Sequence, residues 1–156
     1  MSRFRLAEPR DVDTIVAMMR GYYAQDGYTF VDAEARAAAL MLINDAHLGR
    51  LWVTCEGERV VGYVAVALGF SFEYRGREAF VDELFIAESH RGRGLGREAL
   101  ELAEAYCRDA GVNALHLEVE RHRSRAQELY RKRGFEDLGR YLMTKWLTAQ
   151  ALYPRS

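Results

Sequence analysis

The chain has 156 residues, the length of one domain with a single hydrophobic core. Its hydrophobic fraction of 49%, charged fraction of 29% and net charge of −1 are those of an ordinary globular protein, not of a general nucleic-acid binder. No apolar run approaches the roughly 20 residues that a membrane span needs. Two lone cysteines outside any metal-ligand spacing, and no apolar secretory segment at the start, predict a cytoplasmic protein with no metal site.

The first quarter of the chain predicts a strand followed by two helices. Residues 2–7 alternate between apolar and polar side chains, as a strand does. Pro9 suits a first helical position, and apolar residues then recur at helical spacing to about Gln25. We expect a second helix from Asp32, a typical N-cap residue, to about Leu42.

Strands dominate the middle of the chain. Residues 51–56 and 60–68 flank Gly57 and predict a hairpin. Residues 70–77, with Gly69 before them and Gly76 among them, indicate a second, longer hairpin loop, after which residues 79–86 form the next strand.

The last third predicts a long amphipathic helix over residues 95–110, a strand over 115–119 and a short helix over 124–133. One or two final strands are expected in residues 135–147. The order βααβββαβαβ(β) describes a single α/β domain, residues 1–156, whose mixed sheet is mostly antiparallel and has one parallel crossover.

A loop rich in glycine and arginine precedes the long helix. The glycines allow tight turns and expose successive amide N–H groups, and the helix that follows adds free donors and the positive end of its dipole. Three arginines add positive charge, so the loop predicts a pyrophosphate site. Its residues are Arg91, Gly92, Arg93, Gly94, Leu95, Gly96 and Arg97.

The same stretch also satisfies the dinucleotide fingerprint G-x-G-x-x-A, from Gly94 to Ala99, with Glu118 near the distance of a ribose-binding acid. That fingerprint should follow its strand directly, yet seven residues separate Ile86 from Gly94. A dinucleotide fold also needs more than the single parallel crossover that is visible here. The context therefore disfavours a dinucleotide site.

Two motifs in this order resemble the GNAT superfamily of acyl-CoA-dependent N-acetyltransferases. Arg91–Gly96 matches the R/Q-x-x-G-x-G/A loop, and Asp82–Ile86 resembles the acidic-acidic-Leu-aromatic-aliphatic strand before it. Residues 126–135 resemble the second motif, A-x-x-L-Y-x-x-x-G-F, and the hairpin at 72–77 faintly resembles that of diamine acetyltransferases. The resemblance implies an enzyme that moves an acetyl group from acetyl-CoA to a primary amine by direct attack, without a metal. A homodimer is common among such relatives.

The resemblance also implies cofactor contacts. Backbone groups of Leu84, Phe85 and Ile86 would pair with the pantetheine arm as though it were an added strand. A backbone N–H of this stretch would stabilise the oxyanion of a tetrahedral intermediate. Ala126 opens the second motif, and Arg123 stands where the family often has Asn, so we expect Arg123 to supply a phosphate contact instead.

Tyr130 is the candidate acid for the leaving thiolate, because a phenol titrates near pH 10 and a thiol near 8.5. Its position on an apolar helix face would also suit a core residue. Asp82, Glu83 and Glu118 are candidate bases, and each could instead form a salt bridge. Asp82 and Glu83 are adjacent, so they point to opposite sheet faces unless a bulge intervenes. The four scattered histidines suggest only surface or capping roles.

The acceptor pocket of the superfamily is usually built from the first two helices, their connection and the hairpin before the acidic strand. Aromatic and acidic side chains gather there and suit a small cationic amine. Tyr23, Tyr28, Glu73 and Glu118 are the candidate acceptor residues. A peptide or protein amine, an amino acid, an aminoglycoside or a non-catalytic acyl-CoA-binding module remain alternatives.

Overall fold

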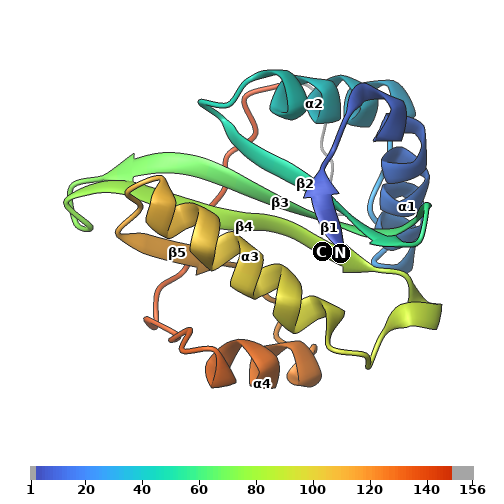
Figure 1. Cartoon of the computed structure of the whole chain (residues 1–156). Helices are drawn as coiled ribbons and strands as arrows, with labels where there is room; N and C mark the ends of the chain where they lie inside the picture. Colours follow the sequence, from blue (N-terminus) through green and yellow to red (C-terminus); the bar gives the residue numbers. More distant parts are fainter. Residues whose placement is uncertain (1–2, 149–156) are drawn as a thin grey trace.

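The computed structural model describes residues 3–148 and shows a twisted five-stranded sheet between helices (Figure 1). In chain order the elements are β1 (Phe4–Leu6), the 3-10 turn η1 (Pro9–Asp11), α1 (Val12–Gln25), α2 (Asp32–Asn44), β2 (Gly49–Glu56), β3 (Arg59–Ser71), β4 (Gly76–Ile86), the 3-10 turn η2 (Glu88–His90), α3 (Leu95–Asp109), β5 (Ala114–Leu117) and α4 (Ser124–Lys132).

The strands lie in the order β1-β2-β3-β4-β5, and the pairs β1–β2, β2–β3 and β3–β4 are antiparallel. β5 pairs with β4 in parallel, and α3 forms the crossover between them. The structure therefore confirms the predicted α/β class, with a mixed, mostly antiparallel sheet and one parallel connection.

Each face of the sheet carries its own core. Val53, Tyr63 and Ala65 lie under α1 and α2, whereas Val64 and Val81 lie under α3. Successive residues of β3 thus alternate between the two cores, and all of these side chains are buried. Figure 1 shows α3 crossing the face opposite α1 and α2.

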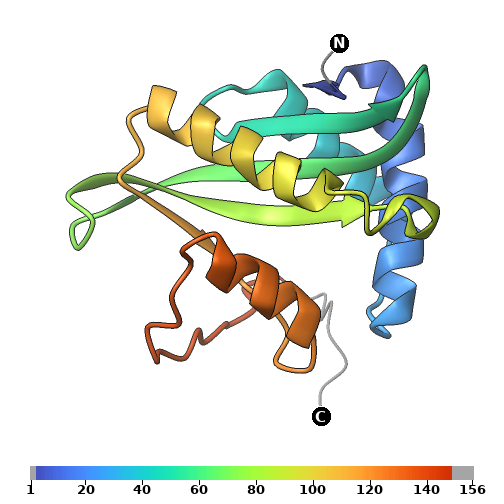
Figure 2. The ribbon, with the colours of Figure 1, turned by 60° about the horizontal axis from the view of Figure 1, so that its bottom comes forward.

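The pairing of β4 changes at Asp82. Ala65 of β3 pairs with Glu83, but the next residue, Val66, pairs with Val81, so Asp82 is an extra residue in a β-bulge. On the other edge of β4, the pairing with β5 ends where Val81 meets Leu117. Figure 2 shows β5 turning away from β4 toward α4. Within residues 3–148, β4 therefore continues from Asp82 to Ile86 with β3 as its only paired strand.

The prediction of one or two strands in residues 135–147 is wrong for the described chain, which is irregular there. The apolar side chains of that segment produced the strand pattern, but those after Phe135 are exposed: Tyr141 is 83% exposed and Met143 is 90% exposed. A strand needs a partner edge as well as a suitable pattern, and this segment lies along none.

Two local expectations also need correction. Val31, not Asp32, is the N-cap of α2, and the Asp32 carboxylate instead accepts hydrogen bonds from Arg20 of α1. The second hairpin is tighter than expected, since β3 extends to Ser71 and β4 begins at Gly76. Arg75 adopts a φ of 61° in the four-residue turn between them.

Candidate active site

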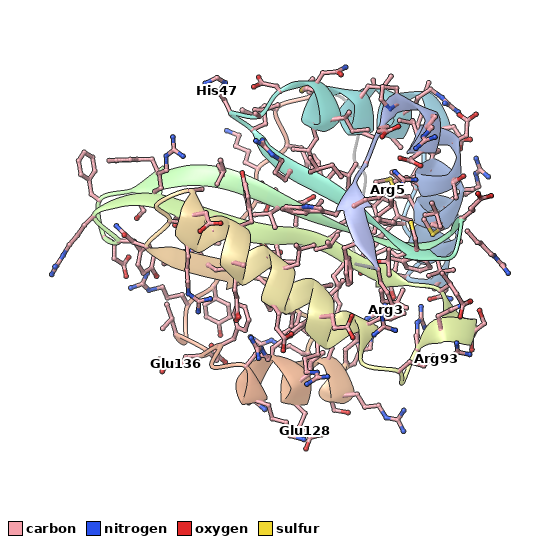
Figure 3. The ribbon with its side chains drawn as sticks, in the orientation of Figure 1. Arg3, Arg5, His47, Arg93, Glu128 and Glu136 are labelled. Atoms are coloured by element: carbon pink, nitrogen blue, oxygen red, sulfur yellow. The ribbon has the colours of Figure 1, made fainter. Side chains whose placement is uncertain are left out.

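The glycine-rich loop ends at the N-terminus of α3. Gly92 and Gly94 have φ values of 76° and 81°, which non-glycine residues rarely adopt. Gly94 is the N-cap of α3 and offers no side-chain cap to the first-turn amides. These N–H groups and the helix dipole can therefore receive an anion. Arg93 lies beside the loop at the edge of the molecule (Figure 3).

A buried histidine, His90, directly precedes the loop and contacts the end of β2. His90 is only 6% exposed, and its Nε2 lies 2.6 Å from Glu56 Oε2 at the end of β2. Its Nδ1 lies 2.8 Å from Ser89 Oγ. The expectation of a surface or capping role is therefore wrong for His90. A lone histidine carries no signal in the sequence that it will be buried.

The free edge of β4 runs directly toward this loop. It carries the backbone groups of Leu84, Phe85 and Ile86, as the predicted cofactor strand requires. The Ile86 carbonyl already accepts a 2.8 Å hydrogen bond from Arg91 Nε. The Phe85 ring stacks 5.8 Å from Tyr63, so its side chain belongs to the core beside α1.

Two tyrosine hydroxyls donate to the Glu83 carboxylate. Tyr63 of β3 donates to Oε1 at 2.8 Å, and Tyr23 of α1 donates to Oε2. Burial raises the pKa of Glu83, the two tyrosine donors oppose the rise, and the Asp82 charge adds to it. Burial also raises the pKa of Tyr63 far above its ordinary value, so its hydroxyl stays a proton donor. Sequence reasoning found Tyr23 but missed Tyr63, because a tyrosine on a buried strand is indistinguishable from a core residue.

The two adjacent acids have different surroundings at the bulge. Glu83 pairs with Ala65 and so faces α1 and α2, whereas Asp82 is exposed at the bulge. Neighbouring protein atoms displace part of the hydration of Asp82 and raise its pKa. Of the two carboxylates, only Glu83 receives the pair of tyrosine hydrogen bonds, and this favours Glu83 as the base.

Tyr130 lies on α4 and is half-buried. Its ring makes an edge contact with Phe135, with centroids 6.0 Å apart. Burial raises the pKa of Tyr130 and Tyr22 adds to the rise, whereas the positive charge of Arg123 lowers it. The phenol is therefore protonated at neutral pH, as a proton donor must be.

Arg123 is directed toward the first helix. Its Nη2 donates to both carboxylate oxygens of Asp26, at 2.8 and 3.0 Å, and its guanidinium lies 5.6 Å from the Tyr22 ring centroid. The predicted phosphate contact of Arg123 thus competes with a formed ion pair. Tyr28, from the same connection as Asp26, donates to Glu120 Oε1 at 2.8 Å.

Glu73 does not join this group. It lies in the turn between β3 and β4, at the end of β4 opposite Ile86, and forms a 2.7 Å ion pair with Arg140. That pair lowers the pKa of Glu73. The expectation that Glu73 lies beside Tyr23 and Glu83 at the mouth of one cleft is therefore not met.

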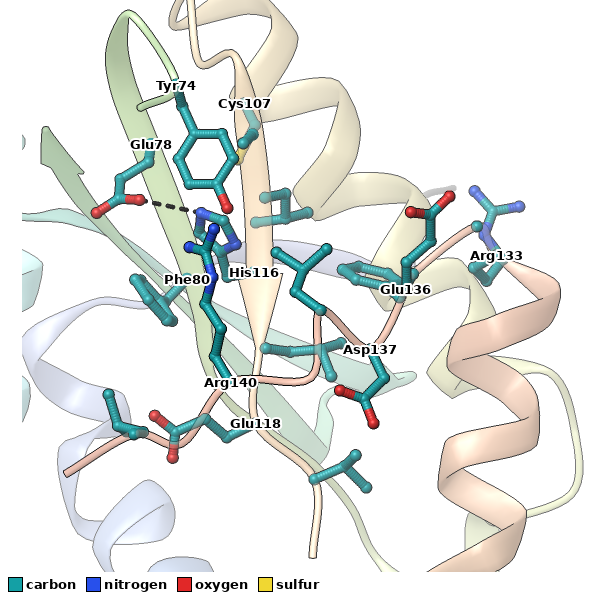
Figure 4. A pocket seen from close by; sticks show the side chains of 18 of the residues that line it. Tyr74, Glu78, Phe80, Cys107, His116, Glu118, Arg133, Glu136, Asp137 and Arg140 are labelled. Carbon is teal, nitrogen blue, oxygen red and sulfur yellow. Dashed lines mark hydrogen bonds and ion pairs between the residues drawn. The ribbon is translucent and has the colours of Figure 1, made fainter. Parts of the chain in front are cut away.

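Glu118 is exposed and lines a broad cavity along β5 (Figure 4). In this cavity His116 Nε2 lies 3.0 Å from Glu78 Oε2, and the Tyr74 ring lies 4.7 Å from the imidazole. The cavity extends to Glu120, which Tyr28 contacts. Glu118 therefore lies just beyond the point at which β5 turns away from β4. It remains a candidate acceptor contact.

No helix of residues 3–148 is both long and apolar enough to cross a membrane. In the same residues, no group of three or more histidine, cysteine or acidic side chains could hold a metal ion. Cys55 and Cys107 are free thiols.

Parts of this chain are similar to proteins named as acetyltransferases. Bovine (Bos taurus) thialysine N-epsilon-acetyltransferase is 29% identical over 83 residues, which cover 53% of this chain and 48% of that protein. This chain therefore aligns with about half the length of the bovine relative.

Solved structures share nearly the whole fold. An integron cassette protein from the mobile metagenome of Cole Harbour Salt Marsh is 36% identical, with a TM-score of 0.84 and coverage of 95% of this chain and 92% of that one. A predicted acetyltransferase from Clostridium acetobutylicum, solved with acetyl-CoA, has a TM-score of 0.79 at 17% identity, over 93% of this chain and 96% of that one. The model of the acetyltransferase (GNAT) family matches residues 12–135, and the chain belongs to that family.

Proposed function

We propose that the protein is an N-acetyltransferase that moves an acetyl group from acetyl-CoA to the primary amine of a small cationic molecule. The observation that carries the proposal is the free edge of β4 over Asp82–Ile86, which leads to the uncapped N-terminus of α3. An extended pantetheine arm can pair with such an edge while the pyrophosphate meets the helix amides. Family membership and the acetyl-CoA complex of the Clostridium relative agree with this use of the fold.

The chemistry needs a base, an oxyanion donor and an acid. Glu83 takes a proton from the acceptor's ammonium group, directly or through water, and the free amine then attacks the thioester. Burial raises the pKa of the Glu83 carboxyl and so makes it a stronger base. A backbone N–H on the free edge can stabilise the tetrahedral oxyanion. As the C–N bond forms and the C–S bond breaks, the Tyr130 phenol gives its proton to the departing thiolate.

The acceptor class follows from the charges near Glu83. Glu83 and Glu120 lie among the rings of Tyr22, Tyr23 and Tyr28, beside the Asp26–Arg123 ion pair, so acids outnumber bases in this group. Acidic and aromatic groups together favour a cation through ion pairing and cation–π contact. The name of the bovine relative, which acts on thialysine, agrees with an amine acceptor. A non-catalytic acyl-CoA-binding module would have no need of the Glu83 cluster or of Tyr130.

A thiol-release assay tests the proposal. With acetyl-CoA and a panel of amines, we expect diamines and other cationic primary amines to release CoA faster than anionic amino acids do. Faster turnover of the anionic amino acids would contradict the acceptor class. If none of the amines in a broad panel caused CoA release, that result would contradict catalysis itself.

Replacement of Tyr130 by phenylalanine removes only a proton donor. We expect Tyr130→Phe to lower kcat by about 10²–10³ while the affinity for acetyl-CoA stays within about twofold. Steady-state kinetics and calorimetry measure the two quantities. Tyr141→Phe is the matched control, because Tyr141 is 83% exposed. Turnover of Tyr130→Phe within about twofold of wild type at all pH values would make Tyr130 a structural residue.

The pH profile tests Glu83. A base works only when ionised, so kcat/KM should fall as pH drops through the raised pKa of Glu83. Glu83→Gln should lower kcat by about 10²-fold or more and abolish this acidic limb. Asp82→Asn should keep the limb but move it to lower pH, because it removes a charge that raises the pKa of Glu83. An unchanged limb in Glu83→Gln would assign the base elsewhere.

A further inference from the structure

Two side-chain hydrogen bonds join segments on opposite sides of the gap where β5 turns away from β4. Arg123 bonds Asp26 at 2.8 Å, and Tyr28 bonds Glu120 at 2.8 Å. Asp26 and Tyr28 belong to the connection between α1 and α2, whereas Glu120 and Arg123 belong to the connection between β5 and α4. The partners are 97 and 92 residues apart in sequence. We call these two bonds the cross-site latch.

The latch spans a region without sheet hydrogen bonds. β4 and β5 are paired only as far as Val81 and Leu117, and the chain after β5 runs away from the sheet. Asp26 is largely shielded, with 14% of its side chain exposed, against 35% for Arg123. A shielded pair with charge-assisted bonds holds its geometry better than an exposed one.

Each bond of the latch leads to an aromatic ring near Glu83. The Arg123 guanidinium lies over Tyr22, whose ring centroid is 5.7 Å from that of Tyr23. The Tyr28 ring makes an edge contact with Tyr23 from another direction, at 6.2 Å. Tyr23 donates to Glu83. Both bonds therefore hold residues that contact the Tyr23 ring, and the hydroxyl of that ring donates to Glu83.

We propose that Asp26, Tyr28, Glu120 and Arg123 are positioning residues, and that the latch orients Tyr22 and Tyr23 so that the Tyr23 hydroxyl donates to the Glu83 carboxylate. None of the four needs to touch the reacting atoms. Arginine at position 123 then has a role that the asparagine often found there in the family could not fill, because asparagine carries no charge for Asp26 and no guanidinium for Tyr22. The kinetic consequences rest on the proposed function, but the hydrogen-bond geometry does not.

The readout is the pKa of the Glu83 carboxyl, measured by NMR titration of protein labelled with 13C at glutamate side chains. Glu83 is assigned from the signal missing in Glu83→Gln. The titratable groups that act on Glu83 are Tyr23 from α1, Tyr63 from β3 and the adjacent Asp82. Tyr22 lies next to this group as well. Tyr23→Phe sets the reference, because loss of its bond to the carboxylate should raise the pKa by about 0.5–1.

The latch is broken in two ways that leave the net charge unchanged. Tyr28→Phe removes one hydroxyl, and Asp26→Asn with Arg123→Gln removes one charge of each sign. We expect each to raise the pKa of Glu83, and their combination to approach the effect of Tyr23→Phe. Added to Tyr23→Phe, the latch changes should raise the pKa no further, because both act through one bond.

The matched control is the pair Asp13–Arg36, which joins α1 to α2 at the surface. Asp13→Asn with Arg36→Gln also preserves the net charge and should leave the pKa of Glu83 unchanged. Thermal melting follows stability in parallel. If the combined variant fails to fold, Tyr28→Phe alone decides, since it alters one hydroxyl.

Three results would overturn the proposal: a Glu83 pKa that latch variants leave unchanged, shifts that add fully to that of Tyr23→Phe, or an equal shift in the Asp13–Arg36 control. Kinetics extend the test. With the best amine of the panel, the broken latch should lower kcat about tenfold while KM for acetyl-CoA changes less than twofold. Absence of turnover in the wild type would refute the proposed function, and the NMR result would still decide the latch.

Discussion

The site depends on the point at which β4 stops pairing with β5. Backbone N–H and C=O groups require hydrogen-bond partners, and β5 supplies them to β4 only as far as Val81. Beyond that point the Asp82–Ile86 edge is available to a ligand. The same stretch contains the bulge, which turns Glu83 toward α1 and α2 and leaves Asp82 exposed. Two changes in the pairing of β4, one on each edge, thus leave a free edge over Asp82–Ile86 and place Glu83 toward the core under α1 and α2.

Charged groups lie on both sides of the free edge. Arg91, Arg93 and Arg97 lie in or beside the loop at the N-terminus of α3, where phosphates would add negative charge. On the α1 side of the free edge, the Glu83 carboxylate accepts hydrogen bonds from the hydroxyls of Tyr23 and Tyr63. A buried carboxylate is costly unless it receives hydrogen bonds, and the two tyrosines meet that cost while leaving its pKa raised.

Much of this could be predicted from the sequence. Helices with strong periodicity were located to within a few residues, and the glycine loop follows from local backbone chemistry, because positive φ at Gly92 and Gly94 requires glycine. The sequence predicts that Asp82 and Glu83 point to opposite faces unless a bulge intervenes, and the structure has a bulge at Asp82. Contacts between distant segments could not be predicted, since no local pattern links Tyr63 to Glu83 or Arg123 to Asp26. The strand prediction for residues 135–147 failed for the same reason, because strand formation depends on a partner edge.

Titration of CoA by calorimetry tests whether the loop and the free edge of β4 bind acetyl-CoA. Gly94→Leu places a side chain at the N-terminus of α3, where the positive φ and the ligand both need glycine. Gly111→Leu is its control, at the other end of α3 with a φ of 73° and open space around it. We predict that CoA affinity falls at least about tenfold in folded Gly94→Leu and stays near the wild-type value in Gly111→Leu. Wild-type affinity in folded Gly94→Leu would contradict the account.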